Sequence, residues 1–119
     1  MLTAIRAGDE VRAFVDRIVS PSYVPDVVAA TAALIEGGSP YGLYHCVNTG
    51  WTNWAELARE LANLAGRSDA AIREVRMAEA GLAASRPQFA ALSNAKLARE
   101  GIVLPAWQDA LARYVATLS

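Results

Sequence analysis

The segments of this chain that have the character of β-strands are few and short, and this limits the folds open to it. Residues 11–15, 44–47 and 72–75 are the strand candidates, and helical patterns separate them. A sheet of two or three short strands is marginally stable by itself. The sequence therefore predicts a mixed α/β chain, rich in helix, that adds to a larger sheet and is not a complete fold.

The clearest helix is predicted to begin near Pro25, because a proline in the first helical turn gives up no hydrogen bond there. Asp26 follows and favours the positive end of the helix dipole. The pair Gly37-Gly38 is predicted to end this helix. The face expected to be apolar carries Val27, Thr31, Leu34 and Ile35.

A second helix is predicted to start near Asn53, which is placed to cap it while Glu56 reaches back three residues later. Residues 94–100 form a further short predicted helix, and Pro105 opens the last one. Residues 77–84 are expected to make one or two helical turns. Trp54 and Trp107 fit helix faces and are predicted to lie in the core.

Composition indicates a small body with apolar surface to spare. Apolar residues make up 54% of the 119 residues, and a short chain has much surface for its volume. The excess is expected to meet the rest of a larger protein or a partner, and self-association stays open.

Charge and cysteine usage narrow the partners and the setting. The net charge is −1, from 11 basic and 12 acidic residues without a basic stripe, which disfavours nucleic acid and anionic membranes. No apolar run is long enough to cross a bilayer, and a single cysteine fits a reducing, cytoplasmic setting.

Several kinds of chemistry lack the residues they need. With one histidine and one cysteine, zinc ligand sets and Cys/His nucleophile pairs are not expected. The glycine-rich phosphate-binding motifs of nucleotide-binding loops are absent. His45 is predicted to be a packed or hydrogen-bonded structural residue. No catalytic, cofactor-binding or metal-ligating residue is assigned in this chain.

Binding residues are easier to nominate. Arg86 precedes Pro87 in a segment without helical pattern, so its backbone is biased toward an extended form and its guanidinium suits a diphosphate. A solvated surface role for Arg86 stays open, and Lys96 and Arg99 are interpreted as surface charges. Among the aromatic residues, Tyr23 beside Pro21 and Trp51 in a turn are the candidates for facing a cleft. The predicted substrate-binding residues are Arg86, Tyr23, Pro21 and Trp51.

The order of motifs resembles a known family. Residues 15–26 (VDRIVSPSYVPD) resemble the Asp-Gln-x-Gly-x-Pro-Thr-Tyr-x-x-Asp segment of dTDP-4-dehydrorhamnose reductases. Residues 42–50 (GLYHCVNTG) are similar to that family's Gly-x-Tyr-His-x-x-Asn-x-Gly, and residues 52–54 follow as its small-polar and tryptophan helix start. Residues 85–96 are similar to the Ala-Arg-Pro, Leu and Lys stretch, and residues 104–111 to the closing Pro-x-Trp and Ala-Leu.

The resemblance implies that residues 1–119 are the carboxyl-terminal, nucleotide-sugar-binding part of an extended short-chain dehydrogenase/reductase. In such enzymes an amino-terminal Rossmann domain holds NADPH and supplies a Tyr-x-x-x-Lys catalytic pair. The only lysine here, Lys96, has Leu92 four positions before it, so that pair is absent. The full-length enzyme is expected to reduce dTDP-4-dehydro-L-rhamnose to dTDP-L-rhamnose, and this chain alone is not expected to catalyse that reaction.

The chain also departs from the family. Arg17, Val19 and Ser22 stand where the family has glutamine, glycine and threonine. Valine does not adopt the positive φ open to glycine at low cost, so the local loop and its substrate contacts are expected to differ. A non-catalytic binding or regulatory module, as in the regulatory subunit of methionine adenosyltransferase, stays an alternative. So does an epimerase or dehydratase acting on another nucleotide sugar. Whether Met1 is a true start is open.

Overall fold

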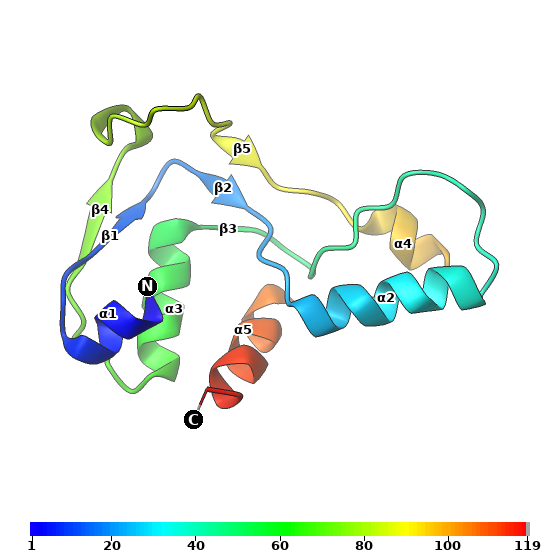
Figure 1. Ribbon diagram of the computed structural model, residues 1–119, viewed down its shortest axis with the longest axis horizontal. Helices are drawn as coiled ribbons and strands as arrows, with labels where there is room; N and C mark the ends of the chain where they lie inside the picture. The colour runs from blue at the N-terminus through cyan, green and yellow to red at the C-terminus, as the bar shows by residue number, and fades with distance from the viewer. Residues whose placement is uncertain (119) are drawn as a thin grey trace.

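The structure is a computed structural model in which residues 1–118 are described. Helices and short strands alternate along the chain (Figure 1). In chain order the elements are α1 (Leu2–Ala7), β1 (Val11–Phe14), β2 (Ile18–Val19), α2 (Val24–Glu36), β3 (Thr52–Asn53), α3 (Trp54–Leu64), β4 (Ile72–Val75), the 3₁₀ turn η1 (Met77–Glu79), β5 (Phe89–Ala90), α4 (Ala95–Arg99) and α5 (Trp107–Ala116).

The strands form two small sheets. In one, β1 and β4 pair in parallel, with Val11 opposite Ile72. In the other, β2 lies in the middle, antiparallel to β3 and parallel to β5. Each parallel pair joins strands that are far apart in the sequence, β1 with β4 and β2 with β5. The chain also returns to β2 after the long excursion through α2, to form the antiparallel β3, as Figure 1 shows.

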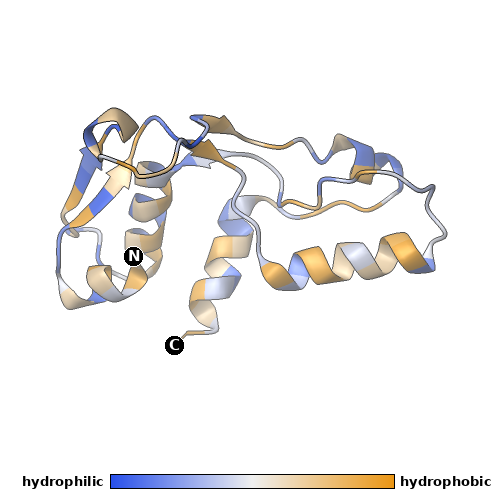
Figure 2. Cartoon of the chain, turned by 45° about the horizontal axis from the view of Figure 1, so that its top comes forward, coloured by the Kyte–Doolittle hydropathy of each residue, from blue (hydrophilic) through white to orange (hydrophobic). Residues whose placement is uncertain are grey.

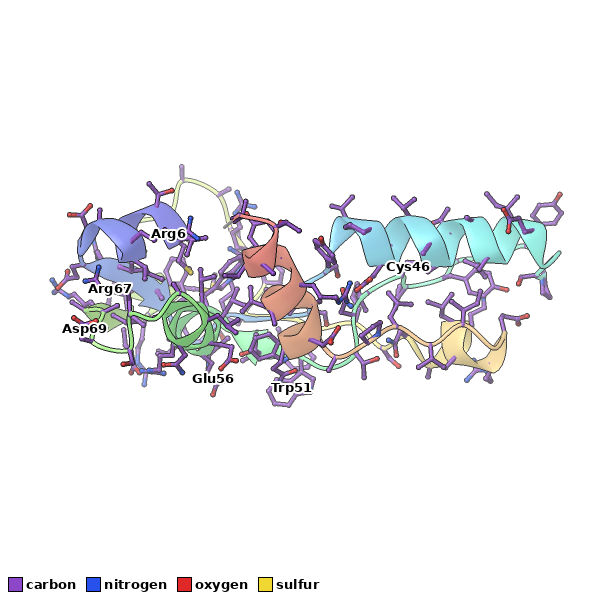
Figure 3. All side chains as sticks on the ribbon, turned by 90° about the horizontal axis from the view of Figure 1, so that it is seen from below. Arg6, Cys46, Trp51, Glu56, Arg67 and Asp69 are labelled. Atoms are coloured by element: carbon purple, nitrogen blue, oxygen red, sulfur yellow. The ribbon has the colours of Figure 1, made fainter. Side chains whose placement is uncertain are left out.

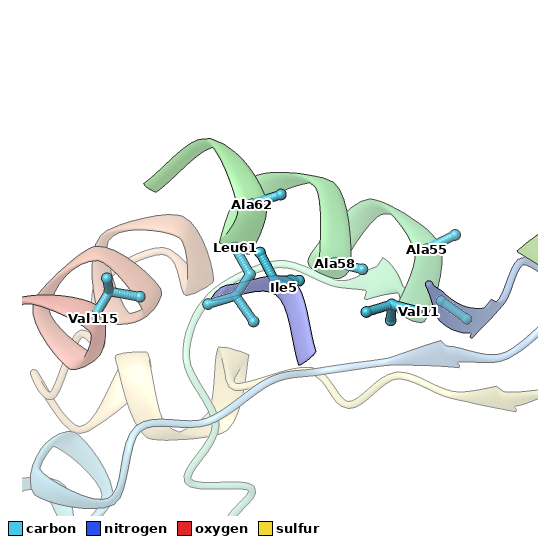
Figure 4. Close-up of a cluster of buried hydrophobic side chains, with 8 residues drawn as sticks. Ile5, Val11, Ala55, Ala58, Leu61, Ala62 and Val115 are labelled. Carbon is cyan, nitrogen blue, oxygen red and sulfur yellow. The ribbon is translucent and has the colours of Figure 1, made fainter. Parts of the chain in front are cut away.

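Two apolar clusters hold these elements together. The larger one packs α1 and α3 against β1 and the end of α5, and Figure 4 shows Ile5 beside Leu61 within it. Ala55 and Ala58 of α3 are completely buried. Because their side chains are small, the helix packs closely against the strands. The smaller cluster joins Ala30 of α2 to Leu97 of α4 and to Leu104.

The body is open and flat. Its radius of gyration is 16.2 Å and it extends 47 × 35 × 19 Å, whereas a compact chain of this length has a radius of gyration near ~13.5 Å. Its accessible surface is 7239 Å², against about 6,200 Å² for a typical folded protein of this mass. Figure 2 shows apolar residues along the outer face of α2, where Val28 and Ile35 are 61% and 76% exposed. The expectation of spare apolar surface is confirmed.

Much of the predicted secondary structure is confirmed. Strands 11–14 and 72–75 form, and helices begin close to Pro25, Asn53 and residue 95. The Asn53 side chain caps α3 by accepting a hydrogen bond from the backbone N–H of Glu56 at 2.8 Å. The Glu56 carboxylate accepts from the hydroxyl of Thr52 and not from the Asn53 backbone. His45 is hydrogen-bonded, with Nδ1 3.2 Å from the carbonyl oxygen of Ser93.

Other predictions are wrong. Residues 44–47 do not form a strand, because within residues 1–118 no strand lies beside them to complete a ladder. On α2, Thr31 and Ile35 face solvent, and the buried residue is Ala30. The last helix, α5, begins at Trp107, two residues after the predicted Pro105. The one or two helical turns predicted in residues 77–84 are present as a single 3₁₀ turn, Met77–Glu79. Trp107 is buried as predicted, but Trp54 is only partly buried.

The isoleucines of α1 and α2 test where the core lies. Ile5→Ala is expected to lower the free energy of unfolding by about 2–5 kcal/mol, because the side chain is completely buried and leaves a cavity. Ile35→Ala is the matched control and is expected to change it by no more than about 0.5 kcal/mol. Urea unfolding followed by circular dichroism measures both. Equal losses would contradict the assignment of the core.

Candidate functional site

A buried asparagine joins three segments that are far apart in the sequence. Asn48 is completely buried, and its Nδ2 donates to Asp26 Oδ2 at 2.6 Å and to the carbonyl oxygen of Pro105 at 3.1 Å. Its Oδ1 accepts from the backbone N–H of Tyr23 at 2.8 Å. Both donors and the acceptor of this amide are therefore used within the protein, and they bring together the start of α2, the turn after residue 47 and the approach to α5.

A charge pair completes this cluster. Arg113 of α5 donates through both terminal nitrogens to the two carboxylate oxygens of Asp26, at 2.8 and 2.6 Å. Its Nε donates to Asp109 one turn earlier on the same helix, at 2.8 Å. The fork geometry suits a bidentate pair, so α5 is fixed to α2 by charged hydrogen bonds as well as by packing.

The cluster sets the ionisation of its acid. The hydrogen bonds from Arg113 hold the pKa of Asp26 below its ordinary value of 3.8, although burial acts in the opposite direction. The hydrogen bond from Asn48 lowers the pKa further. On the other side of the pair, Asp26 and then Asp109 raise the pKa of Arg113. The pair is therefore ionised at neutral pH.

Tyr23 is held between the same groups. Its ring lies under the Arg113 guanidinium, with the guanidinium carbon 5.1 Å from the ring centroid. It also meets the ring of Tyr114 edge-on, with the centroids 6.4 Å apart. Because its backbone N–H is held by Asn48, both the main chain and the ring of Tyr23 are fixed.

An apolar groove opens beside this tyrosine. It encloses about 310 Å³ between the segment that enters α2 and one face of α5. Its walls are mostly apolar, with the hydroxyl-bearing side chains of the segment and of the tyrosines as the polar exceptions. The lining residues are Pro21, Ser22, Tyr23, Val24, Trp107, Ala110, Leu111 and Tyr114.

The structure brings together only part of the predicted binding set. Pro21 and Tyr23 line the groove. Trp51 does not, being 61% exposed, and Figure 3 shows it projecting away from the chain near α5. Arg86 lies on the exposed segment before β5, outside the groove, and makes no ion pair or hydrogen bond with any described residue. Their binding roles stay predictions.

Sequence reasoning missed the residues that hold the groove. The sequence points to Asp26 only through its place in a helix, and to Asn48 only within the motif of residues 42–50. Arg113 lies four residues after Asp109, but its other partner, Asp26, lies 87 residues away and is not evident from spacing. The asparagine of the family's Asn-x-Gly is the one sequence feature that marks Asn48.

Within residues 1–118, no three His, Cys, Asp or Glu side chains gather in a way that could hold a metal ion. In the same residues, no helix combines the length and apolarity that spanning a bilayer requires.

The Asp26–Arg113 pair makes a pH-dependent prediction. Asp26→Asn is expected to lower the free energy of unfolding at pH 7 by about 1.5 kcal/mol, because it removes a charged acceptor from a partly exposed arginine. A depressed pKa contributes stability above the unfolded pKa of about 3.9, and this contribution is lost as the pH falls through the folded value. The difference between wild type and variant should therefore shrink below about pH 4.

Asp109→Asn is the matched control, because this carboxylate binds the same guanidinium but is 57% exposed. Its effect is expected to be at most about 0.5 kcal/mol at pH 7. Thermal unfolding at a series of pH values measures both variants. An Asp26→Asn effect that is the same at pH 7 and pH 2.5, at low and constant ionic strength, would contradict the assigned ionisation.

Comparison with known proteins places the chain in a family. The family model described as RmlD substrate binding domain matches residues 1–119. The spore coat polysaccharide biosynthesis protein SpsK of Bacillus subtilis is 32% identical over 115 residues, which cover 97% of this chain and 40% of that protein. A dTDP-4-dehydrorhamnose reductase of Streptomyces griseus is 32% identical over 101 residues, covering 81% of this chain and 33% of that protein.

Solved structures of dTDP-4-dehydrorhamnose reductases match the fold of this chain. The crystal structure of dTDP-4-dehydrorhamnose reductase from Bacillus anthracis in complex with NADP matches with a TM-score of 0.86 and 33% identity, over 97% of this chain and 42% of that one. The dTDP-4-dehydrorhamnose reductase ortholog of Clostridium acetobutylicum matches with a TM-score of 0.87 and 25% identity, over 98% and 42%.

This chain thus spans between 33% and 42% of the length of these relatives. The expected α/β class and the resemblance drawn from the sequence motifs are both confirmed. Since the family model covers every residue and the relatives match nearly the whole chain, the chain belongs to the RmlD substrate binding domain family.

Proposed function

We propose that residues 1–119 are the substrate-recognition part of a dTDP-4-dehydrorhamnose reductase and bind a dTDP-sugar for reduction by NADPH held elsewhere in a longer protein. The observation that carries the proposal is the family match over the whole chain together with the groove at Tyr23. A groove with apolar walls and a few polar groups is the usual form of a small-molecule site.

The chemistry of the groove suits part of a nucleotide sugar. Aromatic and apolar walls from Tyr23, Trp107 and Tyr114 can bury a base or a deoxysugar. The phosphates need cationic donors instead, and an exposed arginine without a protein partner can supply them. Arg86 is such a residue, so the proposed substrate extends beyond the groove toward the segment before β5.

The nicotinamide cofactor does not fit the residues of this chain. A dinucleotide is usually bound where a glycine-rich turn joins a parallel strand to a helix, so that the backbone can approach the pyrophosphate. In the part of the chain that is described, β1, β2, β4 and β5 are each followed by the next helical element without an intervening glycine. The hydride donor is therefore assigned to the remainder of the longer protein, together with the Tyr-x-x-x-Lys pair.

The proposed setting follows from the substrate. Nucleotide sugars and NADPH are supplied in the cytoplasm, and we place the longer protein there. The relative from Bacillus subtilis carries a name that refers to polysaccharide biosynthesis, which suits an enzyme that supplies an activated deoxysugar. The regulatory and epimerase alternatives raised by the sequence gain no specific support from these names or from the groove.

A chimeric enzyme tests the proposal. The part of the Bacillus anthracis reductase that precedes the matched region is joined to this chain, and NADPH oxidation is followed at 340 nm with dTDP-4-dehydro-L-rhamnose. Turnover is expected with the chimera and not with the 119-residue chain alone, because hydride transfer needs both reactants in contact. A folded chimera that binds NADPH, shown by its fluorescence, but never oxidises it would overturn the proposal.

The groove makes a separate prediction in the same chimera. Tyr23→Ala is expected to raise KM for the dTDP-sugar by about tenfold, since it removes one aromatic wall worth about 1 kcal/mol or more. Tyr41→Ala is the matched control, because this tyrosine is fully exposed, and it should leave KM unchanged. An identical KM in both variants would exclude the groove as a substrate contact.

A further inference from the structure

An arginine without an acceptor lies at one end of the three-stranded sheet. Arg17 immediately precedes β2, and the registers of Ile18 with Phe89 and with Asn53 place it next to Gln88 on one side and Trp54 on the other. The backbone N–H of Ile18 donates to the carbonyl oxygen of Gln88 at 2.7 Å. The position of Arg17 is therefore fixed by pairing on both sides.

The side chain of Arg17 has no hydrogen-bond acceptor within the described residues. Its Nε is buried without a partner, and so is the indole Nε1 of Trp54 beside it. Its one recorded interaction is with the Trp54 ring, whose centroid lies 6.0 Å from the guanidinium carbon. A buried donor left without an acceptor is destabilising. The two terminal nitrogens are not among the buried unpaired atoms, so they can be reached from outside.

The acid that precedes this arginine in the sequence is engaged with other groups. Asp16 accepts from the backbone N–H of Met77 at 3.0 and 3.3 Å and from Gln88 Nε2 at 3.4 Å. Among the described residues, Asp16 forms no ion pair with Arg17, so the guanidinium has no carboxylate partner there.

A second arginine without a hydrogen-bond partner among the described residues precedes the sheet at the same end. Arg86 lies three residues before β5, which runs parallel to β2, and Figure 1 shows the chain entering both strands from the side of β1 and β4. Parallel strands bring their amino ends to the same edge of a sheet. Two arginines without acceptors among the described residues therefore lie on the segments that lead into β2 and β5, and an anion that contacts both would be favoured by their charge.

We propose that Arg17 is a substrate-binding residue that, with Arg86, holds the diphosphate of the nucleotide sugar. The inference rests on the proposed function and adds a residue to it. A guanidinium binds phosphate oxygens through two parallel hydrogen bonds, and the Trp54 ring lies within cation–π distance on one side of it. The family segment that residues 15–26 resemble has glutamine here, so the fold is expected to tolerate Arg17→Gln.

Inorganic pyrophosphate is the probe that isolates this contact. In the chimera, its inhibition constant against the dTDP-sugar is expected to rise by about ten- to a hundredfold in Arg17→Gln, the loss of one charge-assisted bidentate contact. KM for the dTDP-sugar should rise with it, while kcat stays within about twofold, since the contact is made in ground state and transition state alike. Arg17→Lys keeps the positive charge but loses the planar guanidinium, so its inhibition constant and KM should lie between those of the wild type and those of Arg17→Gln.

Arg99→Gln is the matched control, because Arg99 is an exposed arginine in the last turn of α4 and should leave both constants unchanged. Unchanged constants in Arg17→Gln, beside raised constants in Arg86→Gln, would overturn the inference. A lower melting temperature with an unchanged pyrophosphate constant would also overturn it, and would assign the acceptor to the other part of the longer protein. If the chimera fails to turn over the dTDP-sugar, the proposed function fails, and calorimetric titration of pyrophosphate into the same variants still decides the role of Arg17.

Discussion

The hydrogen bonds of Asn48 are the interaction on which the rest of this chain depends. The side chain joins the start of α2, the turn after residue 47 and the approach to α5, and Asp26 extends the connection to Arg113. The two apolar clusters share no buried residue. The polar cluster connects the α2 entrance to α5, the two walls of the groove, by direct hydrogen bonds.

Local signals in the sequence predict the helices, but they do not predict which segments pack or pair with one another. Pro25, Asn53 and Gly37 mark helix ends through chemistry that acts within a few residues, and the helices they delimit form. Residues 44–47 look like a strand, yet a strand needs a neighbour to complete its hydrogen bonds, and none lies beside them in the described chain. The strands β2, β3 and β5 have two residues each, too few for a periodic pattern.

The candidate site shows the same contrast between residues marked by local sequence motifs and residues that act through distant partners. Pro21 and Tyr23 were found because their motif is local, and they line the groove. Arg113 and Asn48 were missed because each acts through a partner that only the folded chain brings near. Arg17 stood out in the sequence solely as a departure from a family motif. Its lack of an acceptor depends on the strand pairing that puts Gln88 and Trp54 on either side of it.

The fixed ring of Tyr23 has a consequence for how tightly a ligand can be held. Its main chain is tied to Asn48 and its face to Arg113, so the side chain has already lost its rotational freedom when the chain folds. Immobilising a side chain at a binding surface usually costs association about 0.5–1.5 kcal/mol. A ligand that meets this wall is spared that entropic penalty, and the preorganisation resides in polar and charged groups that do not themselves line the groove.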